Sequence, residues 1–166
     1  DRNFPGHPRQ VQYREGLYVG YRFHDSAGVP ARFPFGFGLS YTTFDWTDIG
    51  VIGEGLTGDG TDLTVHVTVT NTGTRAGSDV VQVYVRDVES SVARPHQELK
   101  GFAKVHLEPG AATTVATELG RRAFAVWDVD AHDWLVEAGR FELVVARSSA
   151  DVVEVLPVDV VSDDQL

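Results

Sequence analysis

The most regular pattern in the chain is an alternation of apolar and polar side chains between Leu63 and Arg86. Its first half places apolar residues at every second position, between threonines and a histidine: Leu63, Val65, Val67 and Val69. Its second half does the same with Val81, Val83 and Val85, between Val80, Gln82, Tyr84 and Arg86. A period of two predicts strands with one face toward a core and the other face wetter. Turn formers at 71–78, including Gly73 and Gly77, predict that these two strands pair antiparallel at the centre of an all-β sandwich.

Short apolar segments separated by turn residues continue this pattern to Val160. The predicted strands are residues 44–51, 99–107, 112–119, 124–128, 133–137, 141–146 and 152–160, with the register of the first left open. Loops are expected at 53–60 and 87–97, and Glu108, Pro109 and Gly110 suit a type II turn. No segment shows sustained helical periodicity. This spacing of strands predicts an immunoglobulin or fibronectin type III-like β-sandwich.

The first 43 residues do not follow the sandwich pattern. Residues 1–11 are polar and predicted to be a loop. Residues 12–23 are predicted to be a strand, interrupted by Gly16 and Gly20. This strand has no evident neighbour in the sequence, and a lone strand is not stable. Its partners are therefore expected outside this chain.

Residues 33–44 carry five aromatic side chains, punctuated by Pro34, Gly36 and Gly38. Proline and glycine at these positions exclude a regular amphipathic helix, yet the rings must be covered to avoid a large apolar patch. We interpret the segment as an apolar strap packed between two domains. Stacking of the rings on sugars is the alternative.

The charge divides the chain at the same place. The net charge is −10, and residues 1–43 hold five Lys/Arg and three Asp/Glu (+2), so residues 44–166 carry −12. We therefore predict a tail end of a preceding domain with its connector at 1–43, a sandwich at 44–160 and a frayed acidic tail at 161–166. The chain begins with Asp1 rather than Met and is interpreted as a piece of a longer protein.

Composition excludes several classes of function. A strongly acidic chain disfavours nucleic acid and anionic membranes as partners. The absence of cysteine excludes disulfides and thiolate metal sites. No apolar run approaches the ~20 residues of a membrane span, and no signal peptide is visible, so the compartment stays open.

Two groups of acidic residues are candidates for chemistry. Glu15 lies among aromatic residues, but glycosidases need paired carboxylates and nothing in the spacing directs Asp25, the nearest acid, toward it. A structural carboxylate is the preferred interpretation. The cluster Asp128, Asp130, His132 and Asp133 lacks the glycine and distal glutamate of a calcium loop, and a hairpin between short strands explains it better.

Two further groups contain basic residues. His96 and Glu98 would share a strand face as an acid–base pair, but no activated nucleophile accompanies them, so a loop-to-strand junction is preferred. Arg121 and Arg122 form a basic pair in an acidic domain and are expected to be solvated or paired with carboxylates. On the residues alone we predict no catalytic, cofactor or metal site.

Several motifs together resemble one family. The segments YREGLYVGYR (13–22) and FPFGFGLSYT (33–42) resemble the end of the α/β-sandwich domain of glycoside hydrolase family 3 and its connector. The segments VTVTNTG (67–73), 77–84, RPHQELKGF (94–102), LEPG (107–110), WLVEAG (134–139) and RSS (147–149) resemble the family's fibronectin type III-like domain. Departures are confined to the last hairpin, with Ala146 and Arg147 where a glycine is usual and Ala138 where proline is common.

The resemblance implies an accessory segment of a retaining β-glucosidase that is inactive alone. In this family the nucleophile is an aspartate on a (β/α)₈ barrel, and the acid/base is commonly a glutamate on the α/β-sandwich domain. No residue here matches either motif, so the implied partners are those missing domains of the parent chain, through which a β-glucoside would be bound. Two other classes stay open: a free carbohydrate-binding module using Trp127 or Trp134, and a protein-interaction domain with an exposed sheet edge.

Overall fold

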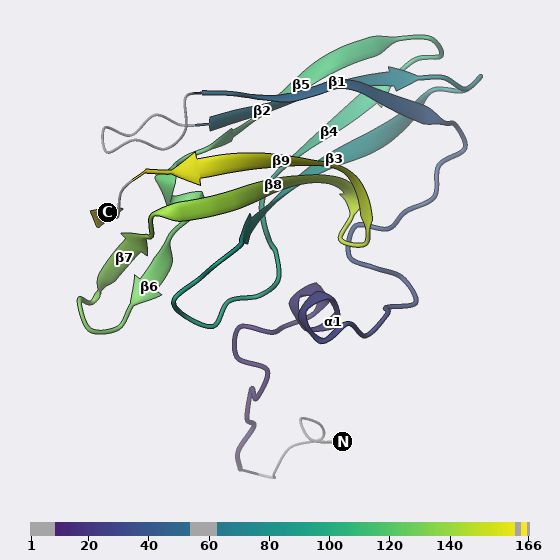
Figure 1. Ribbon diagram of the computed structural model, residues 1–166. Coiled ribbons are helices and arrows are strands. Elements are labelled where there is room, and N and C mark those ends of the chain that lie inside the picture. The colour runs from purple at the N-terminus through teal and green to yellow at the C-terminus, as the bar shows by residue number, and fades with distance from the viewer. Residues whose placement is uncertain (1–8, 54–62, 162–163, 166) are drawn as a thin grey trace.

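The computed structural model describes residues 9–53, 63–161 and 164–165 of the chain. Two antiparallel sheets stack on each other, with strand orders β1-β2-β5 and β4-β3-β8-β9, and a small sheet β10-β7-β6 lies at one end (Figure 1). The predicted all-β sandwich is therefore confirmed. The elements are α1 (Tyr21–Ala27), β1 (Phe44–Ile52), β2 (Leu63–Asn71), β3 (Gly77–Asp87), β4 (Glu98–Leu107), β5 (Ala112–Leu119), η1 (Arg121–Ala123), β6 (Val126–Asp128), β7 (Asp133–Val136), β8 (Gly139–Ser148), β9 (Asp151–Val160) and β10 (Asp164–Gln165).

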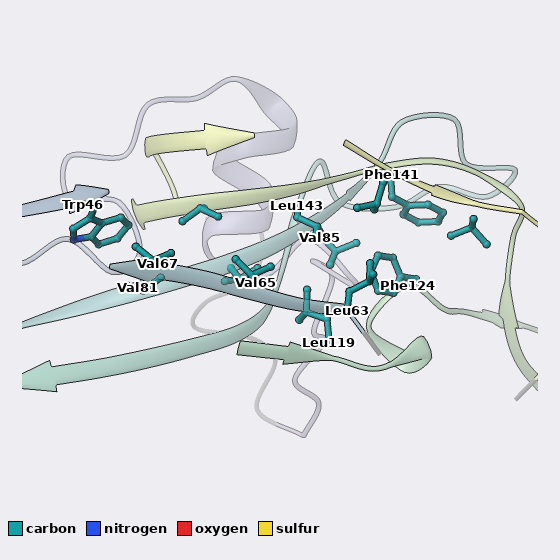
Figure 2. Close-up of a cluster of buried hydrophobic side chains, with 14 of the residues drawn as sticks. Trp46, Leu63, Val65, Val67, Val81, Val85, Leu119, Phe124, Phe141 and Leu143 are labelled. Atoms are coloured by element: carbon teal, nitrogen blue, oxygen red, sulfur yellow. The ribbon is translucent and has the colours of Figure 1, made fainter. Parts of the chain in front are cut away.

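The core lies between the two large sheets and is built by the alternating residues that the sequence singled out. The inward side chains of β2 and β3 are at most 1% exposed: Leu63, Val65, Val67, Val69, Val81, Val83 and Val85. Phe124, Phe141 and Leu143 fill the space between the layers (Figure 2). The outward residues of β2 are half-buried, as predicted.

The predicted pairing of the two central strands is wrong. β2 pairs with β1 and β5, whereas β3 pairs with β4 and β8 in the opposite sheet. Each strand already has a hydrogen-bonded neighbour on both sides, so the turn between them carries the chain across the core rather than back along one sheet. The alternation identified which faces are buried, but it did not determine which strands share a sheet.

The outer face of β3 also differs from the prediction. Gln82 and Tyr84 point away from the main core, but they are only 3% and 0% exposed. The reason is the N-terminal segment, which crosses this face of the sheet and covers it (Figure 1).

The predicted strand over residues 12–23 is wrong as well. Residues 14–17 form turns and residues 21–27 form helix α1. Gly20 precedes the helix at φ 61°, and Gly28 follows it in the left-handed conformation with its N–H bonded to the carbonyl of His24. Both conformations favour glycine, so these two residues delimit the helix. Seven residues are too few to show a helical period in the sequence.

Smaller features resolve what the sequence left open. A register shift in β1 between Thr47 and Gly50, with Asp48 at φ 49°, explains its ambiguous alternation. The predicted type II turn is confirmed, because the N–H of Ala111 bonds to the carbonyl of Glu108 at 3.0 Å and Gly110 has φ 76°.

The polar loop before β4 is present as predicted. β10 lies in the acidic tail and pairs with β7, where no strand was predicted. Most of the loop predicted at 53–60 and of that at 1–11 lies outside the described residues.

Candidate functional site

Helix α1 docks on the outer face of the four-stranded sheet through the residue at its start. The ring of Tyr21 packs edge-on against Tyr84, with centroids 5.7 Å apart, and lies 5.1 Å from the ring of Phe35. Its hydroxyl accepts a hydrogen bond from the backbone N–H of Leu99 at 2.8 Å. Tyr21 thus covers a second, smaller apolar cluster centred on Tyr84, outside the main core.

Two buried polar side chains beneath the helix, Gln82 and Tyr84, form a short chain of hydrogen bonds. The Tyr84 hydroxyl donates to Oε1 of Gln82 at 2.6 Å, and Nε2 of Gln82 donates to the carbonyl of Arg147 at 2.8 Å. Burial, followed by the nearby Tyr21 and Asp25, raises the pKa of the Tyr84 phenol well above its ordinary value. The phenol therefore stays protonated and serves as a fixed donor.

A cluster of ion pairs joins α1 to the start of β4. The guanidinium of Arg94 lies 3.1 Å from Asp87 and 3.1 Å from Glu98, and these three side chains are 6–15% exposed. Glu98 also pairs with Arg22 of α1 at 3.0 Å and with Lys100 at 3.5 Å. A shielded carboxylate that contacts three cations is held in one position, and removing it would leave these cations without their shared partner.

The environment of Glu98 determines its protonation state. Burial alone would raise the pKa of this carboxyl, but the charges of Lys100, Arg94 and Arg22 outweigh burial and hold the pKa below its ordinary value. Burial lowers the pKa of Lys100, and Glu98 partly offsets that effect. Glu98 is therefore an ionised structural anchor, which is a poor state for a general acid at neutral pH.

Hydrogen bonds extend the docking along the helix. Asp25 accepts from Nε2 of Gln97 at 3.0 Å, and Gln97 donates also to the carbonyl of Ser149 at 2.8 Å. The backbone N–H of His96 donates to the Ser26 hydroxyl at 2.9 Å. The predicted alternative of a His96–Glu98 acid–base pair gains no support, since Glu98 is held by cations and His96 contacts α1 through its backbone.

The strap at 33–43 is fixed to the sandwich along one side. The N–H of Ser149 donates to the carbonyl of Phe35 at 2.8 Å, and the Thr42 hydroxyl donates to Asn71 at 2.7 Å. Gly36 has φ 84° and lies so close to the Gln82 amide that a Cβ would collide with it. Only glycine fits this crossing without strain.

The other side of the same segment faces away from the protein. Leu39 and Tyr41 are each 92% exposed, Phe33 is 68% exposed, and Tyr13 upstream is 90% exposed. The chain upstream of α1 leads away from the sandwich (Figure 1), and the Tyr18 hydroxyl, close to the helix, still donates to the carbonyl of Arg94 at 3.3 Å. The N-terminal segment therefore has two faces, one bonded to the sandwich and one apolar face without cover among the described residues.

The acidic candidates lie apart. Glu15 is on the exposed turn before α1, while Asp25 points to Gln97. Asp128 accepts from the N–H groups of Asp130 and Ala131 at 2.9 and 3.1 Å, at the tip of the β6–β7 hairpin. This is the hairpin turn that the sequence favoured. In the part of the chain that the structure describes, no group of three His, Cys, Asp or Glu residues could hold a metal ion.

The basic and tryptophan candidates come together at this hairpin. Trp127 and Trp134 are cross-strand partners with rings 5.3 Å apart in an edge-to-face arrangement. The guanidinium of Arg122, on the 3₁₀ turn η1, lies over the Trp134 ring at 3.0 Å from its centroid. The sequence predicted that Arg121 and Arg122 would be solvated or paired with carboxylates. For Arg122 this prediction is wrong, because its guanidinium stacks on an indole ring.

The contacts between distant motifs were not foreseen from the sequence. Arg22 with Glu98, Tyr21 with Tyr84, and Gly36 with Gln82 all join the first 43 residues to the sandwich. A signal was present: the motif at 13–22 and the motif at 94–102 were both recognised, and the structure shows that their ends meet. The positions of the two motifs along the sequence could not show that they contact each other in the fold.

Comparison with known proteins identifies a matching domain family and several relatives of this chain. Residues 79–149 match the fibronectin type III-like domain. The chain is 50% identical over 151 residues to thermostable β-glucosidase B of Acetivibrio thermocellus, covering 91% of this chain and 20% of that protein. It is 45% identical over 161 residues to an exo-α-(1→6)-L-arabinopyranosidase of Bifidobacterium breve, covering 97% and 21%.

Solved structures agree in fold. The family 3 (GH3) β-glucosidase of Bifidobacterium adolescentis superposes with a TM-score of 0.88 at 42% identity, over 98% of this chain and 23% of that one. The chain thus spans about a fifth of the length of the curated relatives it matches. Within the described residues, no helix has the length and apolar character needed to cross a bilayer.

Proposed function

This chain is a fibronectin type III-like accessory segment of glycoside hydrolase family 3, and from that premise we propose that it stabilises the catalytic domains of a β-glucosidase and is inactive alone. In this proposal residues 1–43 end the preceding α/β-sandwich domain and connect it to the sandwich at 44–160. Residues 161–166, which include β10, follow the sandwich.

One observation carries the proposal: the two faces of the N-terminal segment. Its inner face is anchored by the ion pairs of Glu98 and by Tyr21, so it holds a defined position on the sandwich. Its outer face leaves Phe33, Leu39 and Tyr41 exposed. An ordered apolar face that the described residues do not cover is typical of an interface with another domain.

The reaction is assigned to the parent protein. Relatives of this chain include β-glucosidases and an arabinopyranosidase, so the substrate class we propose is a glycoside with a terminal pyranose, most typically β-linked glucose. The nucleophile and the acid/base would come from the barrel and α/β-sandwich domains. No residue of this chain is given a catalytic role.

A chimera tests the proposal. The segment of the A. thermocellus β-glucosidase B that aligns with this chain is replaced by residues 1–166, and hydrolysis of p-nitrophenyl β-glucoside and thermal inactivation are measured. We expect an active chimera, no hydrolysis by the isolated chain, and a loss of about 5–10 °C in the inactivation temperature of the chimera when Phe33, Leu39 and Tyr41 are all changed to serine.

The matched control is Phe102→Ser, on the exposed side of β4, where the ring is 69% exposed. It should leave the chimera unchanged. The triple variant should also leave the melting temperature of the isolated chain unchanged, because these rings are exposed there. A triple variant that destabilises the isolated chain and spares the chimera would contradict the proposal.

A further inference from the structure

A groove lies among the β6–β7 hairpin, the loop that joins β3 to β4, and the N-terminal segment, which contributes Leu17 and Arg22. It has a volume of about 1020 Å³ and is lined by 23 residues, among them Trp127, Trp134, Arg122, Glu118 and Lys100. Ligand pockets in proteins are commonly about 300–1,000 Å³. The groove is thus large enough for a ligand of several rings, and it lies apart from the exposed strap rings.

The charge of the groove argues for a neutral and polar ligand. Nine of its 23 lining residues are charged, five acidic and four basic, so its net charge is −1 in a chain of net charge −10. Interfaces between proteins are depleted of charged residues at their centres. The other lining residues are mostly apolar, so the groove combines apolar surface with charged groups of both signs. Such a surface fits a ligand that has both an apolar ring face and hydroxyl groups.

The polar groups are also held in place before any ligand arrives. Glu98 is fixed by Arg22, Arg94 and Lys100, and Glu137 accepts from the backbone N–H of Ser91 at 3.3 Å and from its hydroxyl. Preorganised side chains lose little conformational entropy on binding.

The tryptophans supply the apolar part of the surface. Arg122 occupies a face of Trp134, and Trp134 meets Trp127 edge to face. Trp127 remains 46% exposed in the groove. An exposed indole beside fixed carboxylates and guanidinium groups combines stacking with hydrogen bonding.

We infer that this groove binds a neutral oligosaccharide, with a pyranose ring stacked on Trp127 and its hydroxyls bonded to the surrounding charged side chains. The site would hold a glycan chain near an enzyme of the proposed class, but it does not depend on the accessory role. A sandwich that stabilised no partner could still bind sugar here.

The test uses the chain as it is. Cellotetraose and laminaritetraose are titrated into the protein by calorimetry and by amide chemical shifts. We expect saturable binding, shifts confined to residues 17–22, 91–100 and 118–137, and affinity at least about tenfold weaker in Trp127→Ala. Phe102→Ala, which removes a more exposed ring outside the groove, should bind like the unmodified chain.

Trp127→Phe distinguishes lost binding from lost folding. It keeps an aromatic ring at this position and should retain part of the affinity for sugar. The inference is overturned if neither sugar binds at millimolar concentration, if Trp127→Ala binds as well as the unmodified chain, or if the shifts map to the strap. The chimera's stability is unaffected by each of these outcomes, so the two proposals fail separately.

Discussion

Single residues fix how the N-terminal segment crosses the sandwich. Gly36 is the clearest case, because its backbone conformation and its closeness to Gln82 both require the absence of a side chain. Gln82 cannot easily yield, since its amide is bonded to Arg147 and to Tyr84 and is 3% exposed. Glu98 likewise fixes the N-terminal segment on the sandwich, through its ion pair with Arg22 of α1.

Gly36→Ala should lower the free energy of unfolding by about 1–3 kcal/mol, through backbone strain at φ 84° and displacement of Gln82. Chemical denaturation of the isolated chain measures it. Gly38→Ala is the control, because a Cβ there meets nothing within 4 Å and it should change stability by less than about 0.5 kcal/mol. Equal effects of the two substitutions would show that the crossing is not tight.

Glu98→Gln should destabilise the chain by about 1–3 kcal/mol at pH 7, because Arg94 loses a shielded partner. The folded pKa of Glu98 is depressed, so its contribution is complete above the unfolded value near 4.5 and is lost as the pH falls through the lower folded pKa. The difference between variant and unmodified protein should therefore shrink below pH 4.5.

Unfolding in urea at a series of pH values from neutral to acidic gives this difference. Glu89→Gln, at an exposed position in the β3–β4 loop, serves as the control and should track the unmodified chain. A difference that persists unchanged at the acidic end would show that the side chain acts through packing rather than charge.

At the scale of elements, α1 illustrates a helix that exists because of its contacts. A helix of seven residues is far below the ~12–15 residues at which isolated helices become marginally stable. Its side chains at 21, 22, 25 and 26 all reach β4 or the loop before it, which is the spacing of one helical face. Docking therefore supplies the stability that propensity does not.

Tyr21→Ala should release α1 while leaving the sandwich folded. Amides of residues 21–29 should exchange with solvent at least about tenfold faster, because the ring contacts with Tyr84 and Phe35 are lost. Amides of β2 should keep their protection. Hydrogen exchange resolves both, and Phe23→Ala, at a ring 49% exposed that packs on His24, should leave α1 protected. Fast exchange across the whole chain would contradict local release.

At the scale of the whole molecule, two apolar clusters have different roles. The main cluster between the sheets joins nearly every strand and accounts for the sandwich. The second, around Tyr84, Val144 and Ala146, lies on the outer face, where Tyr21 of the N-terminal segment covers it together with Leu99 and Val155. The segment is thus an addition to a domain whose core does not depend on it.

Residues 44–166 alone should fold, with a melting temperature lower by about 5–15 °C than that of the full chain. The loss follows from uncovering Tyr84 and from removing Arg22, together about 2–4 kcal/mol. Calorimetry of both chains checks it. An unfolded 44–166 chain would mean that the N-terminal segment is part of the core. An unchanged melting temperature would mean that docking of this segment does not stabilise the sandwich.

The sequence by itself determined which faces of β2 and β3 are turned toward the main core and approximately where most strands of the sandwich lie. Alternation at Leu63–Val69 and Val81–Val85 is a local property, and burial of one face follows from it directly. The turn at Pro109 and Gly110 and the hairpin at Asp128 were likewise set by local chemistry. The resemblance carried by several motifs gave the family.

Only the tertiary structure decided what meets what. The sheet to which β2 or β3 belongs, the helix at 21–27 and the burial of Tyr84 all depend on contacts between residues far apart in sequence. The groove beside Trp127 is formed by five segments, none of which signals it alone. Local sequence patterns determine backbone conformation and the side of a strand that is turned to the core. Which strands pair over long sequence distances depends on the burial and hydrogen bonding that the folded chain offers.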